Sequence, residues 1–161
     1  MELIDTISPA YGIKSSTEYS PMRAYEYRHM VSFEETNLVG NVYYVNHLRW
    51  QGRCREMFLY DHGIDILKDF AEGLAIVTVR VSCEYFSELV AFDKLIIRMK
   101  LGGIVQNRIT LLFEYYRESE AGETLIAKGE QQVACMRRAG ERLEPTPIPE
   151  QLRNALRLYA D

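Results

Sequence analysis

The stretch that decides the fold spans Phe33 to Phe58 and is F-E-E-T-N-L-V-G-N-V-Y-Y-V-N-H-L-R-W-Q-G-R-C-R-E-M-F. Its first half contains Gly40 and is typical of a loop, whereas its second half has helical periodicity. The pattern predicts a helix from about Asn46 to His62, with Asn46 as its N-cap and Gly63 as its stop. The remaining elements must be arranged around this helix.

The predicted helix is apolar on most of its circumference. At roughly 100° per residue its solvated side is formed by Arg49, Arg53, Glu56 and Tyr60. The other faces carry Trp50, Cys54 and Met57, and Leu48, Gly52 and Leu59. A helix of this kind has to be wrapped by other elements, so we expect a sheet curled around it.

Arg55 interrupts one apolar face of this helix and therefore points into a covered site, which is costly unless it meets an acceptor or an anion. It can reach the helix edge or pair with a structural carboxylate such as Glu35. Alternatively its guanidinium lines a pocket that holds a carbonyl, an enolate or water, where positive charge stabilises developing negative charge.

Alternating patterns predict a mostly antiparallel sheet after the helix. A strand at Ala24–Ser32 precedes the helix, and one more helical turn is expected at Asp65–Ala71. The long half-buried strand Leu74–Leu89 would place Ala75, Val77, Val79, Val81, Cys83 and Tyr85 on one face, and Thr78, Arg80, Ser82 and Glu84 on the other. Further strands are expected at Lys94–Leu101, Arg108–Glu118 and Leu125–Arg138, with turns at Gly102–Gly103 and Ala121–Gly122. Ile148, Leu152, Ala155, Leu156 and Tyr159 have the spacing of a short closing helix.

Composition sets the class of the protein. With 161 residues, 47% of them hydrophobic and 26% charged, we expect one α+β domain over residues 23–161, preceded by a poorly ordered segment at residues 1–22. The net charge of -4 disfavours nucleic acid as a partner. Three scattered cysteines without a CxxC pattern indicate thiols in a reducing, cytoplasmic compartment and no metal site. No apolar run is long enough for a membrane span.

The 4-hydroxybenzoyl-CoA thioesterase-like hotdog enzymes share the pattern aromatic-x-D-x-D-x-x-G-x-V at the loop and helix start. When Phe33 is aligned with the aromatic position and Gly40 with the glycine, the segment resembles this pattern. Glu35 occupies the first acidic position, and Asn37 stands at the second, where the catalytic acid would be. The segment is more similar still to the thioesterases of enediyne biosynthesis, which carry Asn in place of the acid and an Arg on the central helix, here Arg55. The resemblance covers roughly residues 23–160.

This resemblance implies a hotdog fold, with about five antiparallel strands around one helix. It also implies dimers whose sheets join edge to edge, paired into a homotetramer, with active sites at the dimer interface and no cofactor. The implied substrate is a conjugated polyene with a β-oxo or β-hydroxy thioester on an acyl carrier protein, released by hydrolysis from an iterative polyketide synthase in the biosynthesis of an enediyne antibiotic.

The implied site lacks a carboxylate nucleophile, because Asn37 can only form hydrogen bonds. Asn37 and Arg55 are therefore predicted to orient the attacking water and the β-substituent. Backbone N–H groups of Tyr44 and Val45 at the helix start would polarise the thioester carbonyl.

Substrate contacts are predicted for Glu35, which is also a rival base, and for Gly40, Tyr43 and His47. His47 can instead cap the helix or contact a partner subunit. Thr78 and Arg80, taken to lie side by side on the polar strand face, would reach a substrate in the neighbouring subunit or serve as surface residues. Cys54 is expected to be a packing residue.

Two other functions fit the same sequence. One is hydrolysis of an acyl-CoA, and the other is non-catalytic binding of acyl thioesters, which the missing acid would allow. Acyl carrier proteins are acidic, so a local basic rim should dock one. The candidates for that rim are Arg49, Arg53, Arg137, Arg138 and Arg142.

Overall fold

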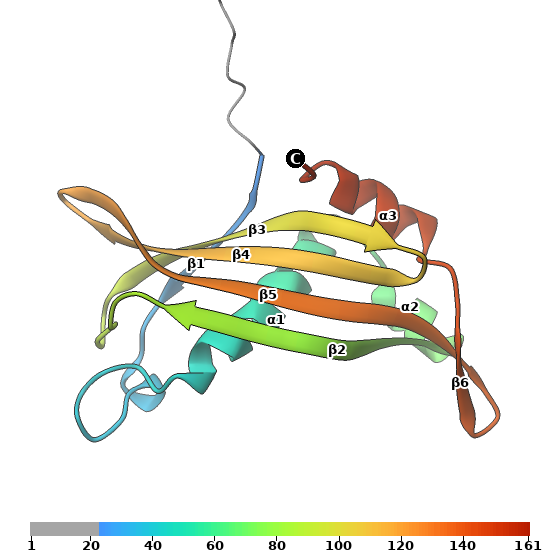
Figure 1. Ribbon diagram of the computed structural model, residues 1–161, viewed down its shortest axis with the longest axis horizontal. Helices are drawn as coiled ribbons and strands as arrows, with labels where there is room; N and C mark the ends of the chain where they lie inside the picture. Colours follow the sequence, from blue (N-terminus) through green and yellow to red (C-terminus); the bar gives the residue numbers. More distant parts are fainter. Residues whose placement is uncertain (1–22) are drawn as a thin grey trace, which may run out of the picture.

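The computed structural model describes residues 23–161, so the segment predicted at residues 1–22 lies outside the described residues. The elements follow in the order β1 (Tyr25–Met30), η1 (Phe33–Glu35), α1 (Val45–Asp61), α2 (Ile66–Ala71), β2 (Leu74–Tyr85), β3 (Lys94–Val105), β4 (Arg108–Ser119), β5 (Gly122–Ala139), β6 (Arg142–Pro145) and α3 (Glu150–Arg157). Within this part of the chain the strands form one sheet in the order β1-β3-β4-β5-β2, with β6 on β5 and every strand pair antiparallel (Figure 1). The predicted α+β hotdog arrangement is confirmed.

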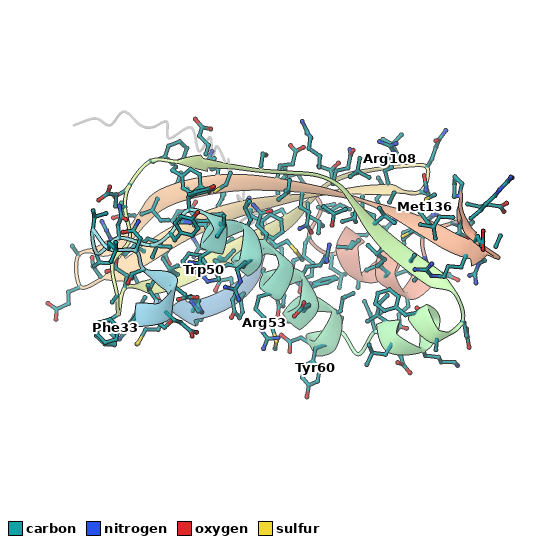
Figure 2. The ribbon with its side chains drawn as sticks, turned by 90° about the horizontal axis from the view of Figure 1, so that it is seen from below. Phe33, Trp50, Arg53, Tyr60, Arg108 and Met136 are labelled. Atoms are coloured by element: carbon teal, nitrogen blue, oxygen red, sulfur yellow. The ribbon has the colours of Figure 1, made fainter. Side chains whose placement is uncertain are left out.

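The core lies between the sheet and α1. Figure 2 shows the three α-helices on the same side of the sheet, with Arg53 and Tyr60 of α1 pointing away from it. Alternate residues of the central strands face the helices and are buried, among them Leu95, Ile97, Met99, Ile109, Leu111, Phe113, Tyr115 and Val133. Cys54 and Phe58 meet them from α1 and are 0% exposed, which confirms the packing role of Cys54. Burying each large apolar side chain stabilises the fold by roughly 1.5–3 kcal/mol.

The two ends of α1 differ from each other in how well the sequence predicts them. Asn46 is not the N-cap; Tyr44 is, without a side-chain cap bond. The Asn46 side chain is buried instead, and its Nδ2 donates to the Glu35 carbonyl at 2.8 Å. The C-terminal prediction is confirmed, because Gly63 has φ +64° and its N–H donates to the Tyr60 carbonyl.

The long strand β2 departs from strict alternation. Its register with β5 shifts between Thr78 and Arg80, so that Thr78 lies opposite Val133 and Arg80 lies opposite Gln132. This bulge at Val79 exchanges the two faces of the strand. The single face predicted for Ala75, Val77, Val79, Val81, Cys83 and Tyr85 is therefore wrong. Ala75 and Val77 lie on one face, whereas Val81, Cys83 and Tyr85 lie on the other.

The β3–β4 connection also differs from the prediction. Strand β3 continues through Gly102 and Gly103, where its register with β4 shifts, and the turn follows at Gln106, whose φ is +55°. The glycine pair marks a bulge, not a turn, because the alternation of the strand resumes beyond it. Helix α3 is confirmed and buries Leu152, Ala155 and Leu156.

Candidate active site

Glu35 anchors the loop that leads into α1. Its carboxylate accepts hydrogen bonds from the Ser32 backbone N–H and from Trp50 Nε1, both at 2.8 Å, and lies 2.9 Å from His29 Nε2. Burial by itself would raise the pKa of Glu35, but these donors outweigh it and the pKa is lowered. The Glu35 carbonyl also accepts from the Tyr43 N–H at 2.9 Å. A carboxylate with so many donors is a weak base, so the geometry disfavours Glu35 as the catalytic base.

Asn37 lies in the exposed tip of the same loop. Its Oδ1 accepts from the Val39 N–H at 3.0 Å, and its carbonyl accepts from the Gly40 N–H at 2.9 Å. Gly40 has φ +89°, a conformation that favours glycine. The turn directs Leu38 and Val39 into solvent, with relative exposures of 107% and 83%. The Nδ2 of Asn37 takes part in none of the hydrogen bonds formed within residues 23–161, so it can donate to a ligand.

Arg55 lies under the sheet, as its position on the helix predicts. Its Nη1 donates to Gln131 Oε1 on β5 at 2.8 Å, and no carboxylate within the described residues forms an ion pair with it. The predicted alternative of a pair with Glu35 is not observed. Burial lowers the pKa of Arg55, and the Glu56 charge only partly opposes this. The guanidinium is thus a covered positive charge with one neutral partner.

No hydrogen bond joins Asn37 and Arg55 within residues 23–161, because Asn37 bonds within its own loop and Arg55 bonds to Gln131. Arg55 lies about 15 Å along the helix axis from the first residue of α1, whereas Asn37 lies in the loop before that residue. Their predicted joint action therefore requires a second protomer or an extended substrate that reaches both.

A cavity of about 290 Å³ lies at the N-terminal end of α1. It is lined by Asn41, Val42, Tyr44, His47, Tyr85, Phe86, Ser87, Glu88 and Leu89. The Tyr44 carbonyl accepts from the Tyr85 hydroxyl at 2.8 Å. The backbone N–H groups of Tyr44 and Val45 form no hydrogen bond within residues 23–161, so both predicted carbonyl donors are available.

His47 forms part of the wall of this cavity. Its side chain is 3% exposed, and its ring lies 4.8 Å from Tyr85, 5.0 Å from Trp50 and 5.6 Å from Tyr115 between centroids. Neither ring nitrogen has a hydrogen-bond partner in the described part of the chain. Burial lowers the pKa of His47 to about 4, and the nearby Tyr44 carbonyl offsets only part of this effect. The ring is neutral at pH 7, and it does not cap the helix.

Gln51 is a polar residue of the site that the sequence analysis missed. It is 0% exposed; its Nε2 donates to the Ser82 carbonyl at 3.0 Å, and its Oε1 has no partner among residues 23–161. A Cβ at Gly129 would clash with Gln51 Nε2, so any larger residue there would displace the Gln51 amide. His47, Gln51 and Arg55 follow one another at intervals of four residues, which places them on one face of α1. This spacing, counted back from Arg55, is the signal that could have identified Gln51.

Asn41 and Glu88 are further cavity residues that the sequence analysis missed. Asn41 Nδ2 donates to Glu88 Oε1 at 3.0 Å, which links the loop before α1 to the segment after β2. No local pattern marks this contact, because the two residues come from segments far apart in the chain.

The other predicted substrate residues are more exposed. Tyr43 is 46% exposed, with its ring 4.8 Å from that of Tyr44. Thr78 and Arg80 were predicted to lie side by side, and this is wrong, because the bulge places them on opposite faces of β2. Arg80 forms an ion pair with Glu130. A contact from either residue to a substrate in a neighbouring subunit stays a prediction.

Comparison with known proteins agrees with this geometry. The model of the thioesterase-like superfamily matches residues 31–156. The dynemicin thioesterase, whose crystal structures describe induced-fit and allosteric effects upon polyene binding, is 48% identical with a TM-score of 0.82, over 86% of this chain and 99% of its own. No curated protein sequence matches the chain.

Two more distant structures share the fold. A 1,4-dihydroxy-2-naphthoyl-CoA thioesterase from Synechocystis is 19% identical with a TM-score of 0.75, over 83% of this chain and 96% of its own. A mutant of 4-hydroxybenzoyl-CoA thioesterase complexed with 4-hydroxybenzoyl-CoA is 17% identical with a TM-score of 0.75, over 83% and 99%. Within residues 23–161, none of the helices has the length and hydropathy of a membrane span. The chain belongs to the thioesterase-like superfamily and is a hotdog-fold thioester hydrolase.

Proposed function

We propose that this thioesterase releases a polyene polyketide, with a β-oxo or β-hydroxy group, from an acyl carrier protein in enediyne biosynthesis. The observation that carries the proposal is the covered guanidinium of Arg55, which has a neutral amide partner and no carboxylate in the described part of the chain. Its free charge suits an oxygen of the acyl chain. The 48% identity to the dynemicin thioesterase, whose structures describe polyene binding, supports the same substrate class.

The proposed reaction uses orientation and electrostatic stabilisation in place of an acidic nucleophile. Backbone N–H groups of Tyr44 and Val45, together with the helix dipole of α1, stabilise the oxyanion that forms on the thioester carbonyl. Asn37 and Arg55 hold the β-substituent, which orients the carbonyl carbon toward the water. Water attacks the carbonyl carbon, the C–S bond breaks, and the thiolate of the carrier arm leaves with the proton that the water loses. No cofactor is required for this step.

The proposed active unit is a homodimer, and two dimers form a tetramer. Strand β2 ends the sheet, and its Val77, Val79 and Val81 are 37%, 43% and 40% exposed. An unpaired apolar edge of this kind is suited to pairing with the same strand of a second copy. Such pairing would bring a second set of site residues to the interface, where Asn37 of one protomer and Arg55 of the other can act on one substrate.

The carrier protein is proposed to dock on basic residues around the site. Arg49 and Arg53 are exposed on α1, and Arg137, Arg138 and Arg142 are exposed near the β5–β6 turn. Charge reversal of the docking residues should raise the KM for a carrier-bound substrate and leave turnover of a short soluble thioester unchanged. If no arginine of either group has this effect, carrier docking on these surfaces is refuted.

A direct assay tests the function. The purified protein should hydrolyse a β-oxo polyene thioester on a carrier protein faster than the same acyl group on CoA, with the acid measured by mass spectrometry. Preference for the CoA ester would identify an acyl-CoA thioesterase instead. Arg55→Ala and Asn37→Ala should each lower kcat about 10²-fold or more, while Tyr60→Ala, on the exposed face of the same helix, should not. Full activity in both site variants would refute the proposed roles of Asn37 and Arg55.

A further inference from the structure

His47 and Gln51 each carry a buried acceptor atom that has no partner among residues 23–161. Both side chains lie on the same face of α1, one helical turn apart, where such neighbours have Cβ atoms about 5–6 Å from each other. The side chain of His47 is 3% exposed and that of Gln51 is 0% exposed. Within residues 23–161, neither ring nitrogen of His47, of which one accepts and the other donates in the neutral ring, has a hydrogen-bond partner, and Oε1 of Gln51 accepts no hydrogen bond. Native proteins rarely leave such groups unsatisfied unless water or a ligand reaches them.

His47 lies beside the proposed reaction site, and Gln51 lies one helical turn further along α1. His47 lines the 290 Å³ cavity into which the helix start opens, next to the free N–H groups that would hold the thioester carbonyl. Trp50, Tyr85 and Tyr115 surround the ring, and the Tyr115 hydroxyl donates to the His47 carbonyl at 2.7 Å. Gln51 is held in place by its bond to the Ser82 carbonyl, which leaves Oε1 fixed and free. Both acceptors are thus preorganised.

We infer that His47 and Gln51 bind the attacking water, and that His47 is the general base which takes its proton. The two hydrogens of one water match two adjacent acceptors, a ring nitrogen of His47 and Oε1 of Gln51. As the water oxygen bonds to the thioester carbonyl carbon, the ring nitrogen accepts one proton. The imidazolium then gives that proton to the departing thiolate, so the products are the carboxylic acid and the free thiol. This inference rests on the proposed thioester hydrolysis and assigns its proton transfer.

Other groups near the site are less suited to this role. Glu35 is occupied by donors from Ser32, His29 and Trp50. Burial raises the pKa of the Cys54 thiol well above its usual range, and the side chain is sealed in the core. The ring of His47 is neutral at pH 7 because burial lowers its pKa, so it is in the form that can accept a proton.

The test compares His47→Phe with His62→Phe. Both remove a histidine of the α1 region, but His62 Nε2 lies 2.9 Å from the Tyr159 hydroxyl, whereas the nitrogens of His47 have no partner in the described chain. His47→Phe should lower kcat about 10²–10⁴-fold and change KM little. It should also raise Tm by roughly 2–6 °C, because unsatisfied buried nitrogens are removed. His62→Phe should lower Tm and leave kcat unchanged.

Nucleophile rescue separates a lost base from a damaged site. Hydroxylamine attacks thioesters without a base, so His47→Phe should still catalyse hydroxamate formation above the uncatalysed rate. Should His47→Phe fail to fold, Gln51→Met provides the second measurement: it removes one water acceptor and should lower hydrolysis about 10-fold and spare hydroxamate formation. His47→Gln, which keeps an acceptor but cannot carry the proton, should have intermediate activity.

The possible results separate the water site, the role of His47 as a base and the proposed thioesterase function. If the wild type hydrolyses the carrier-bound thioester and His47→Phe retains its kcat, the water site is refuted and the proposed function stands. Loss of hydrolysis and hydroxamate formation together in folded His47→Phe refutes the role as a base. Failure of the wild type to hydrolyse any activated thioester refutes both proposals.

Discussion

At the scale of the residue, hydrogen-bond partners decide the chemistry of the site. Glu35 and His47 are both buried near the start of α1, but Glu35 has several donors and His47 has no partner for its ring in the described chain. Their pKa values are both lowered, for different reasons. Donors stabilise the charged form of Glu35, whereas burial destabilises the charged form of His47. Glu35 is therefore a structural residue, whereas the ring of His47 is available to a ligand.

The titration of His47 predicts a loss of stability in mild acid. Its pKa is about 4 in the folded protein and 6.5 ordinarily, so the unfolded chain binds the proton first. The free energy of unfolding should therefore fall by about 3 kcal/mol at most as the pH decreases from 6.5 to 4. Tyr85 and Tyr115 face the His47 ring, and burial raises the pKa of both phenols, so neither of them titrates between pH 6.5 and 4. Urea unfolding over this pH range should show the slope in the wild type and a smaller slope in the variant; equal slopes would contradict the prediction.

Arg55 and Gln131 should behave as a coupled pair. Gln131→Met leaves the buried guanidinium without its acceptor and should lower the free energy of unfolding by about 1–3 kcal/mol. Arg55→Met leaves Gln131 Oε1 unsatisfied and should also destabilise the fold. The double variant replaces both polar groups, so its loss should be smaller than the sum of the two. Urea titrations at one protein concentration give the three values, and simple additivity would show that the contact at 2.8 Å carries no coupling.

At the scale of the element, the short helix η1 and its loop decide where the start of α1 lies. Both parts of the capping box are present: the Ser32 side chain accepts from the η1 backbone, and Glu35 accepts from the Ser32 N–H. The Glu35 side chain also reaches Trp50 on α1, and its carbonyl receives the Tyr43 N–H. The loop is thereby fastened to Trp50 of α1 and closed at Tyr43 just before the helix, which holds the turn that contains Asn37.

Glu35→Gln should loosen this loop. The amide keeps the shape but loses the charge, so the fold should lose about 1.5–3 kcal/mol. Because the pKa of Glu35 is lowered in the folded state, the stabilisation is present above the ordinary pKa and disappears as the pH falls through the folded value. At pH 7 the free energy of unfolding should be higher for the wild type than for Glu35→Gln. This difference in free energy should become smaller as the pH is lowered. The neighbouring exposed Glu34→Gln is the control and should show neither effect.

At the scale of the whole molecule, the proposed site draws on two protomers. Asn37 lies in the loop before α1 and Arg55 lies within α1, where it bonds to Gln131, and the apolar edge of β2 has no partner strand in the described chain. A sheet edge of this length exposes backbone groups that a second copy can pair with. The proposed dimer therefore serves both stability and the assembly of the site.

Val79→Lys should separate the protomers. A charge on the β2 edge opposes pairing with a second strand, so sedimentation should show a monomer where the wild type forms dimers or tetramers. Hydrolysis should fall about 10²-fold or more if both protomers build the site. Val105→Lys changes a valine that is 71% exposed at the end of β3, away from this edge, and should preserve assembly and activity. A fully active Val79→Lys monomer would refute the shared site.

Patterns among neighbouring residues are enough to predict some features of this protein. The apolar faces of α1, the stop at Gly63, the antiparallel strands and the buried position of Arg55 all follow from residues within one or two turns of each other. Only the packing of distant segments fixes the bulge at Val79, the loss of the N-cap role of Asn46, the contact of Arg55 with Gln131, and the lack, among residues 23–161, of a partner for the His47 ring and for Gln51 Oε1. These features depend on register and on contacts between segments far apart in the chain. The periodicity of the sequence shows which face of a helix or strand is buried. Only the packing of the elements shows which buried polar groups have a hydrogen-bond partner.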